Sequence, residues 1–169
     1  VYFPRLIVPF SIVISNMVKM GIQLVLFLVV YAYYFIVLGT FEINWTIVLF
    51  PVLLLMLASL GLGFGLVISS LTTKYRDLRF LITFGVQLWM YATPVIYPLS
   101  VMKQNYPDKI WVIVANPLTA IIETFKYGFT GVGVFEWNYL LYSFVMSIAV
   151  LLLGIIVFNR VQKNFMDVI

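Results

Sequence analysis

The chain has 169 residues, of which 64% are hydrophobic and only 9% are charged, and its mean hydropathy is +1.11. Soluble domains carry about 25% charged residues, so this composition predicts an integral membrane protein. The formal net charge is +4, which in so apolar a chain bears on membrane topology and does not indicate nucleic-acid binding. Because the chain has no cysteine and no histidine, disulfides, thiolate chemistry, histidine-bound metals and imidazole catalysis are excluded.

Four uncharged windows are long enough to cross a bilayer, at 20–41, 43–73, 80–102 and 137–159. A spanning helix needs about 20 apolar residues, and inside lipid only helices or closed barrels satisfy their own backbone hydrogen bonds. The apolar run 52–57 does not alternate as a barrel strand would. We therefore predict an all-α polytopic membrane protein that forms a single transmembrane domain, with spans at 11–38, 45–71, 80–97 and 138–159.

The basic residues predict which side of the membrane each loop faces. Four spans place both ends of the chain on one side, and cytoplasmic loops are enriched in lysine and arginine. Most basic residues fall on the side of the termini: Arg5, Lys19, Lys74, Arg76, Arg79, Arg160 and Lys163, against Lys103, Lys109 and Lys126 on the other side. We therefore expect both termini, including segment 1–10 and tail 160–169, to be cytoplasmic.

The first two spans carry patterns of polar and small residues. Ser11, Ser15, Lys19 and Gln23 repeat at i+4 in the first span, which draws one polar line down the helix. This line indicates either interfacial solvation, or contact with another helix or an aqueous vestibule. In the second span, Gly61 with Gly65 and Ser59 with Gly63 form small-xxx-small pairs, which favour close helix packing over a hinge.

The third span contains polar and aromatic residues where a lipid-facing helix would be aliphatic. Thr83, Gln87 and Tyr91 share one face at i+4 spacing, and Trp89 is offset from them. At about 1.5 Å per residue, Trp89 lies roughly 15 Å beyond Arg79, near mid-membrane and away from the interfacial aromatic belts. Two readings remain open: a lining for a sliding glycan, whose rings have apolar faces and hydroxyl edges, or helix–helix packing with Gln87 bonding a neighbour.

The segment 99–136 predicts two short helices that dip into the outer leaflet. Asn116 and Pro117 read as a helix start, and the glycines from Gly128 onward end that helix. Glu123 and Lys126 form a polar i, i+3 pair, which indicates a structural salt link rather than catalysis. The chain shows neither a phosphate-binding loop nor a carboxylate cluster, so we expect it not to be an enzyme and to hold no cofactor or metal of its own.

Several segments together carry a resemblance to a known family: VYFPR (1–5), KYRDLR (74–79), QLWMYATPVIYP (87–98), NPL (116–118), IETFKY (122–127) and RVQKNFMDVI (160–169). They resemble the permease subunit of type-2 ABC exporters for O-antigen (lipopolysaccharide), capsule and teichoic-acid polymers. Members of that family have six spans, so the resemblance implies that this sequence is N-terminally truncated and lacks the first two. It also implies a homodimer in the bacterial inner membrane, paired with nucleotide-binding ATPase subunits that hold ATP and Mg.

The resemblance assigns roles to particular residues. Tyr2, Phe3, Pro4 and Arg5 match the segment that docks on the ATPase. Gln87, Trp89, Tyr91 and Thr83 match the lining of the polysaccharide channel, whereas Asn116, Pro117, Glu123 and Lys126 match the external gate. We expect the membrane subunit of an exporter that moves lipid-linked polysaccharide out of the cytoplasm. The alternatives are a permease for a smaller lipid or drug, a polytopic enzyme acting on polyprenyl-linked sugars, or a membrane scaffold.

Overall fold

The computed structural model describes residues 7–39, 43–75, 77–95, 97 and 99–166. All regular structure in these residues is helical, which confirms the predicted all-α class. The elements are α1 (Ile7–Leu38), the 3₁₀ helix η1 (Trp45–Leu49), α2 (Phe50–Lys74), α3 (Leu78–Ala92), α4 (Leu99–Asn105), the 3₁₀ helix η2 (Pro107–Lys109), α5 (Ile110–Val114), α6 (Pro117–Thr130) and α7 (Trp137–Met166).

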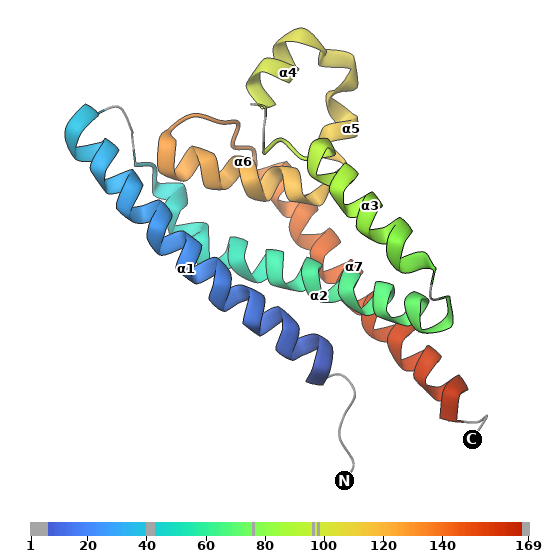
Figure 1. The fold of residues 1–169 in the computed structure, drawn as a ribbon. Coiled ribbons are helices and arrows are strands. Elements are labelled where there is room, and N and C mark those ends of the chain that lie inside the picture. Colours follow the sequence, from blue (N-terminus) through green and yellow to red (C-terminus); the bar gives the residue numbers. More distant parts are fainter. Residues whose placement is uncertain (1–6, 40–42, 76, 96, 98, 167–169) are drawn as a thin grey trace.

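The four longer helices α1, α2, α3 and α7 run alternately up and down (Figure 1). The first turn of α1, the connection at Tyr75 and the last turns of α7 share one end, which we call the Tyr75 end. The short helices α4 and α5 and the transverse helix α6 lie at the opposite end, which we call the α6 end. The arrangement therefore has the alternating directions that four spans require.

Three helices of the described chain are long and apolar enough to cross a membrane, at Ile7–Val37, Trp45–Thr72 and Trp137–Val161. The helix in the third predicted span, α3, has only 15 residues and is about 22 Å long. It ends at Ala92, before the predicted boundary at residue 97, because Thr93 is extended (φ −102°, ψ 136°) and precedes a proline. Among the described residues, three of the four expected spans therefore have a helix of spanning length, and a crossing by α3 stays a prediction.

The tightest packing in the fold is between α2 and α7. Gly63 of α2 meets Gly154 of α7, and a Cβ at Gly63 would lie 2.7 Å from the Val150 carbonyl atoms. Ser143 and Ser147 are buried on the same face of α7, so small residues line this seam. The prediction of close helix packing is confirmed at Gly63. By contrast, a Cβ at Gly61 or Gly65 would have no neighbour within 4 Å.

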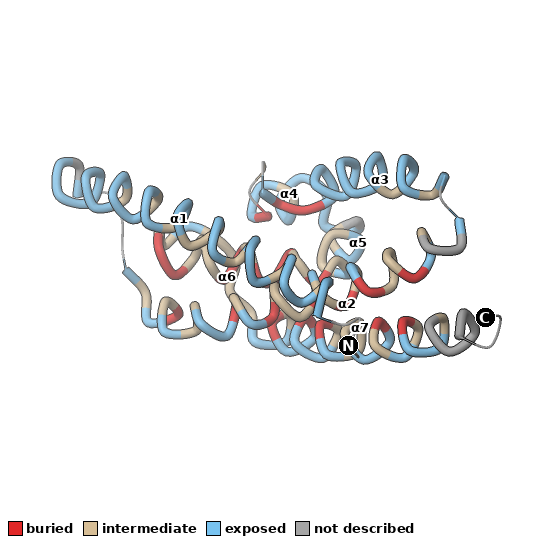
Figure 2. The backbone as a smooth tube through the Cα atoms, turned by 60° about the horizontal axis from the view of Figure 1, so that its bottom comes forward, coloured by how far each residue is buried: buried red, intermediate tan, exposed pale blue. Residues whose placement is uncertain are grey.

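The core continues from this seam to the α6 end. Its buried cluster comprises Leu53, Met56 and Leu60 of α2, Ile121 of α6 and Leu140 of α7. Figure 2 shows buried residues along α2, α6 and α7, whereas α1 and α3 are exposed over most of their length. No residue of α3 is buried. In this chain, α3 therefore presents most of its surface outward.

Helix α1 contacts the rest of the fold through aromatic rings at the α6 end. Phe27 lies 5.4 Å from Phe129 and 5.6 Å from Phe125 between ring centroids, and Tyr31 lies 5.7 Å from Phe129. The polar line of the first span is exposed along its length, including Lys19. Within the described residues, that line is not covered by α2, so both readings of it remain open.

Candidate functional site

The predicted channel residues do not lie on one face of α3. Two residues along a helix correspond to a rotation of about 200°, so Trp89 points almost opposite to Gln87 and Tyr91. Tyr91 is 66% exposed, and Gln87 and Thr83 are also exposed. The Thr83 hydroxyl donates to the Arg79 carbonyl at 2.9 Å, within its own helix. These three residues form an outward polar face on α3.

Trp89 packs against α2 instead. Its ring lies 5.0 Å from the ring of Phe64 at an interplanar angle of 77°, an edge-to-face contact, and the residue is 36% exposed. Edge-to-face pairs are favoured because the positive ring edge meets the negative ring face. The helix-packing reading therefore holds for Trp89, whereas the exposed Gln87 and Tyr91 remain candidates for a lining.

An apolar hollow of about 430 Å³ lies beside this ring contact, between α2, α3 and α6. Its walls are apolar apart from Thr93 and include Phe64, Trp89, Leu118 and Ile122. Hydrocarbon matches such walls, whereas sugar hydroxyls would find few partners there.

The segment that follows α3 is bound to the start of α6 by hydrogen bonds. Thr93 is 3% exposed; its hydroxyl donates to the Trp89 carbonyl at 3.0 Å and accepts from Asn116 Nδ2 at 2.9 Å. Asn116 Oδ1 also accepts from the Leu118 N–H at 3.1 Å, and Pro117 occupies the first turn of α6. The predicted helix start at Asn116 and Pro117 is confirmed, and Asn116 has a second role as a donor to Thr93.

The predicted salt link between Glu123 and Lys126 is confirmed. Lys126 Nζ lies 3.4 Å from Glu123 Oε1, and Glu123 is 1% exposed. The other carboxylate oxygen, Oε2, accepts from the Val134 N–H at 3.2 Å. Lys126 Nζ also donates to the Pro94 carbonyl, which lies just beyond the end of α3. The carboxylate and the ammonium group are thus both bonded, as expected for a structural pair.

Two glycines shape the connection that covers this pair. Gly131 has φ 70° and terminates α6 in the left-handed conformation that favours glycine, as the sequence predicted. Gly133 has φ 149°, and a Cβ there would lie 3.2 Å from the Glu123 carbonyl oxygen. The connection can therefore pass directly over Glu123.

The structure bonds three of the four predicted gate residues, Asn116, Glu123 and Lys126, to the segment after α3 or to one another, and Pro117 lies in the first turn of α6. It also adds two residues that the sequence interpretation did not assign to the gate. These are Thr93 and Pro94, which are separated along the chain from their partners on α6 by 23 and 32 residues. Their place within the ATPVIYP segment was the only signal available. The predicted docking residues Tyr2, Phe3, Pro4 and Arg5 lie outside the described residues.

An exposed ion pair joins the neighbouring short helix α4 to the residue before α7. Lys103 Nζ of α4 lies 3.0 Å from Glu136 Oε1, and both side chains are exposed. The hydrogen bond to Glu136 raises the pKa of Lys103 above its ordinary value. This Lys–Glu pair is exposed to solvent, whereas the pair of Glu123 and Lys126 is largely buried, so substitution of Lys103 is a control for substitution of Lys126.

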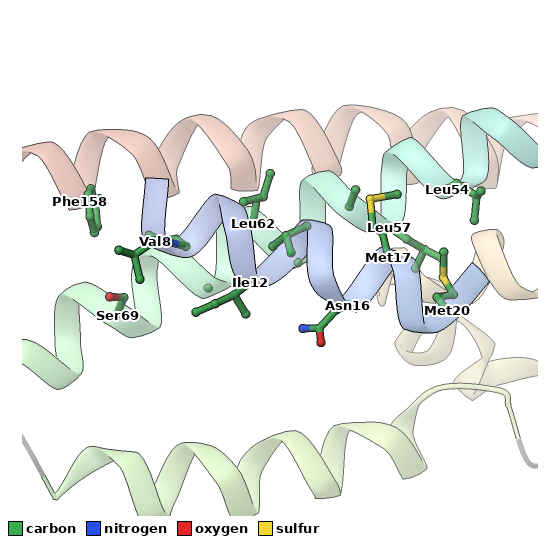
Figure 3. Close-up of a pocket in the computed structure, with 15 residues that line it drawn as sticks. Val8, Ile12, Asn16, Met17, Met20, Leu54, Leu57, Leu62, Ser69 and Phe158 are labelled. Atoms are coloured by element: carbon green, nitrogen blue, oxygen red, sulfur yellow. The ribbon is translucent and has the colours of Figure 1, made fainter. Parts of the chain in front are cut away.

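At the Tyr75 end, a cleft of about 460 Å³ separates α1 from α2 (Figure 3). Val8, Ile12 and Asn16 of α1 line one side, and Leu62 and Ser69 of α2 line the other. Gly61 and Gly65 line this cleft, which explains why a Cβ at either position would have no neighbour within 4 Å.

The chain is similar to known membrane transport proteins. The model of the ABC-2 type transporter family matches residues 2–130. An O-antigen export system permease protein RfbA from Myxococcus xanthus is 29% identical over 126 residues, covering 75% of this chain and 46% of that protein. A protein of the same name from Klebsiella pneumoniae is 23% identical over 168 residues, covering 99% of this chain and 61% of that protein.

The chain thus spans about half to three-fifths of the length of these curated relatives. The family model covers the helices from α1 to α6, including the exposed face of α3 and the bonds between Thr93, Pro94 and α6. The chain belongs to the ABC-2 type transporter family.

Proposed function

We propose that this chain is the membrane subunit of an ATP-driven ABC exporter that moves lipid-linked polysaccharide, of the O-antigen kind, across the bacterial inner membrane. The observation that carries the proposal is the exposed polar face of α3, formed by Thr83, Gln87 and Tyr91. The names of the relatives from Myxococcus xanthus and Klebsiella pneumoniae support the choice of substrate.

A polar face at membrane depth is costly unless it meets protein or water. Tyr91 is 66% exposed, and no described part of this chain buries α3. A second copy of the permease would cover this face and leave a polar route between the two α3 helices. Tyrosine suits a passing sugar because its ring packs on apolar C–H faces while its hydroxyl group exchanges hydrogen bonds.

The charges support the proposed orientation. Arg79 at the start of α3 and Arg160 near the end of α7 belong to the Tyr75 end, which we assign to the cytoplasm because cytoplasmic loops are rich in basic residues. The resemblance implies that an ATPase subunit, which binds ATP and Mg, docks on this chain through Tyr2–Arg5 on the cytoplasmic side. Arg5→Glu should therefore weaken co-purification of the ATPase and reduce export, and unchanged binding with unchanged export would remove this role.

One observation favours a second candidate, a permease for a smaller lipid or drug. The 430 Å³ hollow beside Trp89 has apolar walls that suit hydrocarbon better than sugar. Stimulation of the partner ATPase by small lipids, without stimulation by lipid-linked glycan, would favour this candidate over the exporter.

Thiol labelling tests the lining directly, because the chain has no cysteine of its own. Single cysteines at Gln87 and Tyr91 should react with a water-soluble thiol reagent in at least one nucleotide state of the assembled transporter. Cysteine at Val86, which is 55% exposed but lies about 100° around the helix from Gln87 and about 140° from Tyr91, is the matched control and should stay unreactive. Protection of Gln87 and Tyr91 in every state would rule out the lining.

A further inference from the structure

The outer end of α3 is held by side-chain bonds in addition to the ring contact between Trp89 and Phe64 of α2. Along its 15 residues α3 buries nothing, yet Thr93 and Pro94 directly after it are almost completely buried. Both residues are bonded to side chains of α6, through Asn116 and Lys126. The position of α3 therefore depends on the Trp89–Phe64 contact and on a few polar contacts just beyond its end.

Lys126 brings a positive charge close to the C-terminal end of α3. The last carbonyls of a helix have no partner within the helix, and the C-terminus carries partial negative charge. The Pro94 carbonyl lies two residues beyond the end of α3 and accepts a hydrogen bond from Lys126 Nζ. Lys126 thus attaches α6 to the C-terminal end of α3 by a charge-assisted bond.

Glu123 orients this ammonium group. Its carboxylate is buried, lies 3.4 Å from Lys126 Nζ, and is itself held by the Val134 N–H. A second link runs parallel to the first, since the Thr93 hydroxyl bonds both Asn116 Nδ2 and the Trp89 carbonyl. The backbone at Trp89 is therefore connected to α6 through Thr93.

We propose that Lys126, oriented by Glu123, is a positioning residue that latches the outer end of α3 to α6 in the closed state. The latch comprises Asn116, Glu123 and Lys126 on α6 and the Thr93–Pro94 segment. Opening of the outer end requires the Lys126 bond to the Pro94 carbonyl and the parallel Asn116 bond to Thr93 to break, and loss of the Lys126 bond makes this detachment easier. The inference rests on the proposed function, in which α3 lines the route.

Three substitutions separate this role from simple charge balance. Lys126→Met removes the bond but leaves the Glu123 carboxylate buried without its counter-charge, which can unfold the protein. The double variant Glu123→Gln/Lys126→Met has no uncompensated charge and still lacks the bond to Pro94. Lys126→Arg keeps a cationic donor. Lys103→Met, in the exposed pair with Glu136, is the control.

The first measurement is the distance between spin labels on cysteines at Leu88 and Val132, in the native permease in membranes. Both positions are exposed, at 53% and 64%, and no other cysteine of this chain interferes. We expect the double variant to raise the population of a detached α3 about 10- to 100-fold, the effect of losing one charge-assisted hydrogen bond. Lys126→Arg and Lys103→Met should both retain the wild-type distances.

A double variant with wild-type distances would overturn the latch, because charge balance alone would then explain Lys126. Displacement of α3 by Lys103→Met would overturn it too, since any loss of charge at this end would have the same effect. The second measurement is ATP-dependent export of lipid-linked glycan. If the distances change as expected but the wild-type transporter exports no glycan, the proposed substrate is wrong and the latch stands. If the wild-type transporter exports glycan but the distances in the double variant do not change, the latch is wrong and the proposed substrate stands.

Discussion

The crossing of α2 and α7 at Gly63 makes a quantitative prediction about stability. In Gly63→Ala, the new Cβ would lie 2.7 Å from the carbonyl carbon and oxygen of Val150 and 2.8 Å from the Leu151 nitrogen. Ordinary contact begins at 3.4 Å, so the two helices must separate locally by roughly 0.7 Å. Because all three neighbours are backbone atoms, no side chain can rotate aside to relieve the contact.

The cost follows from two opposing effects. Overpacking of this kind costs about 1–3 kcal/mol, and alanine regains up to about 1 kcal/mol over glycine in a helix interior. Gly61→Ala on the same helix is the matched control, because its Cβ would meet nothing within 4 Å and only the gain applies. We therefore expect Gly63→Ala to be about 2 kcal/mol less stable than Gly61→Ala.

Thermal unfolding in detergent micelles, followed by loss of helical circular dichroism, measures this difference. For a chain of this length, 2 kcal/mol corresponds to a melting temperature about 4–8 °C lower for Gly63→Ala. Equal melting temperatures for the two variants would refute the inferred close crossing of α2 and α7.

Three further predictions concern the α6 end of the molecule, and all are checked by thermal unfolding in the same detergent. Asn116→Ala should cost about 1–2 kcal/mol because the cap of α6 is lost, whereas Asn116→Ser keeps a capping oxygen and should cost less; equal losses would contradict the cap. A double-mutant cycle with Phe64→Leu and Trp89→Leu should give a coupling of about 1 kcal/mol, and strict additivity would exclude their ring contact. The carboxylate partner of Lys103 raises its pKa, so this pair persists below the ordinary lysine pKa and is lost only as pH rises through the raised value. Lys103→Met should therefore leave both the melting temperature and its pH dependence between about pH 6 and 9 unchanged, because the exposed pair is well screened.

The exposed face of α3 and the latch have different consequences for transport. In the proposed exporter, substitutions at Gln87 or Tyr91 alter the proposed lining of the route, so they should change substrate preference. Substitutions at Lys126 alter where α3 stands, so they should change opening for every substrate alike. This distinction follows from the geometry, since Lys126 bonds the backbone beyond α3 and leaves the exposed face of the helix free.

Much of the local structure was predictable because its causes are local. In lipid, a long apolar stretch must satisfy its own backbone hydrogen bonds, so α1, α2 and α7 follow from composition alone. Asn116 and Pro117 begin α6 and Gly131 ends it through the chemistry of capping. Residues three apart on a helix are neighbours, so the Glu123–Lys126 contact needed no knowledge of the fold.

What the sequence could not predict is which face of each helix meets the others. In a membrane protein, lipid-facing and core-facing residues are both apolar, so the hydrophobic pattern does not indicate how a helix is rotated. Tertiary packing decided that Gly63, rather than Gly61 or Gly65, touches α7, and that Trp89 turns toward Phe64. It also decided that Thr93 and Pro94 bind α6, since those bonds join residues distant in the chain. Such contacts depend on the relative positions of whole helices, which no spacing of residues along the chain encodes.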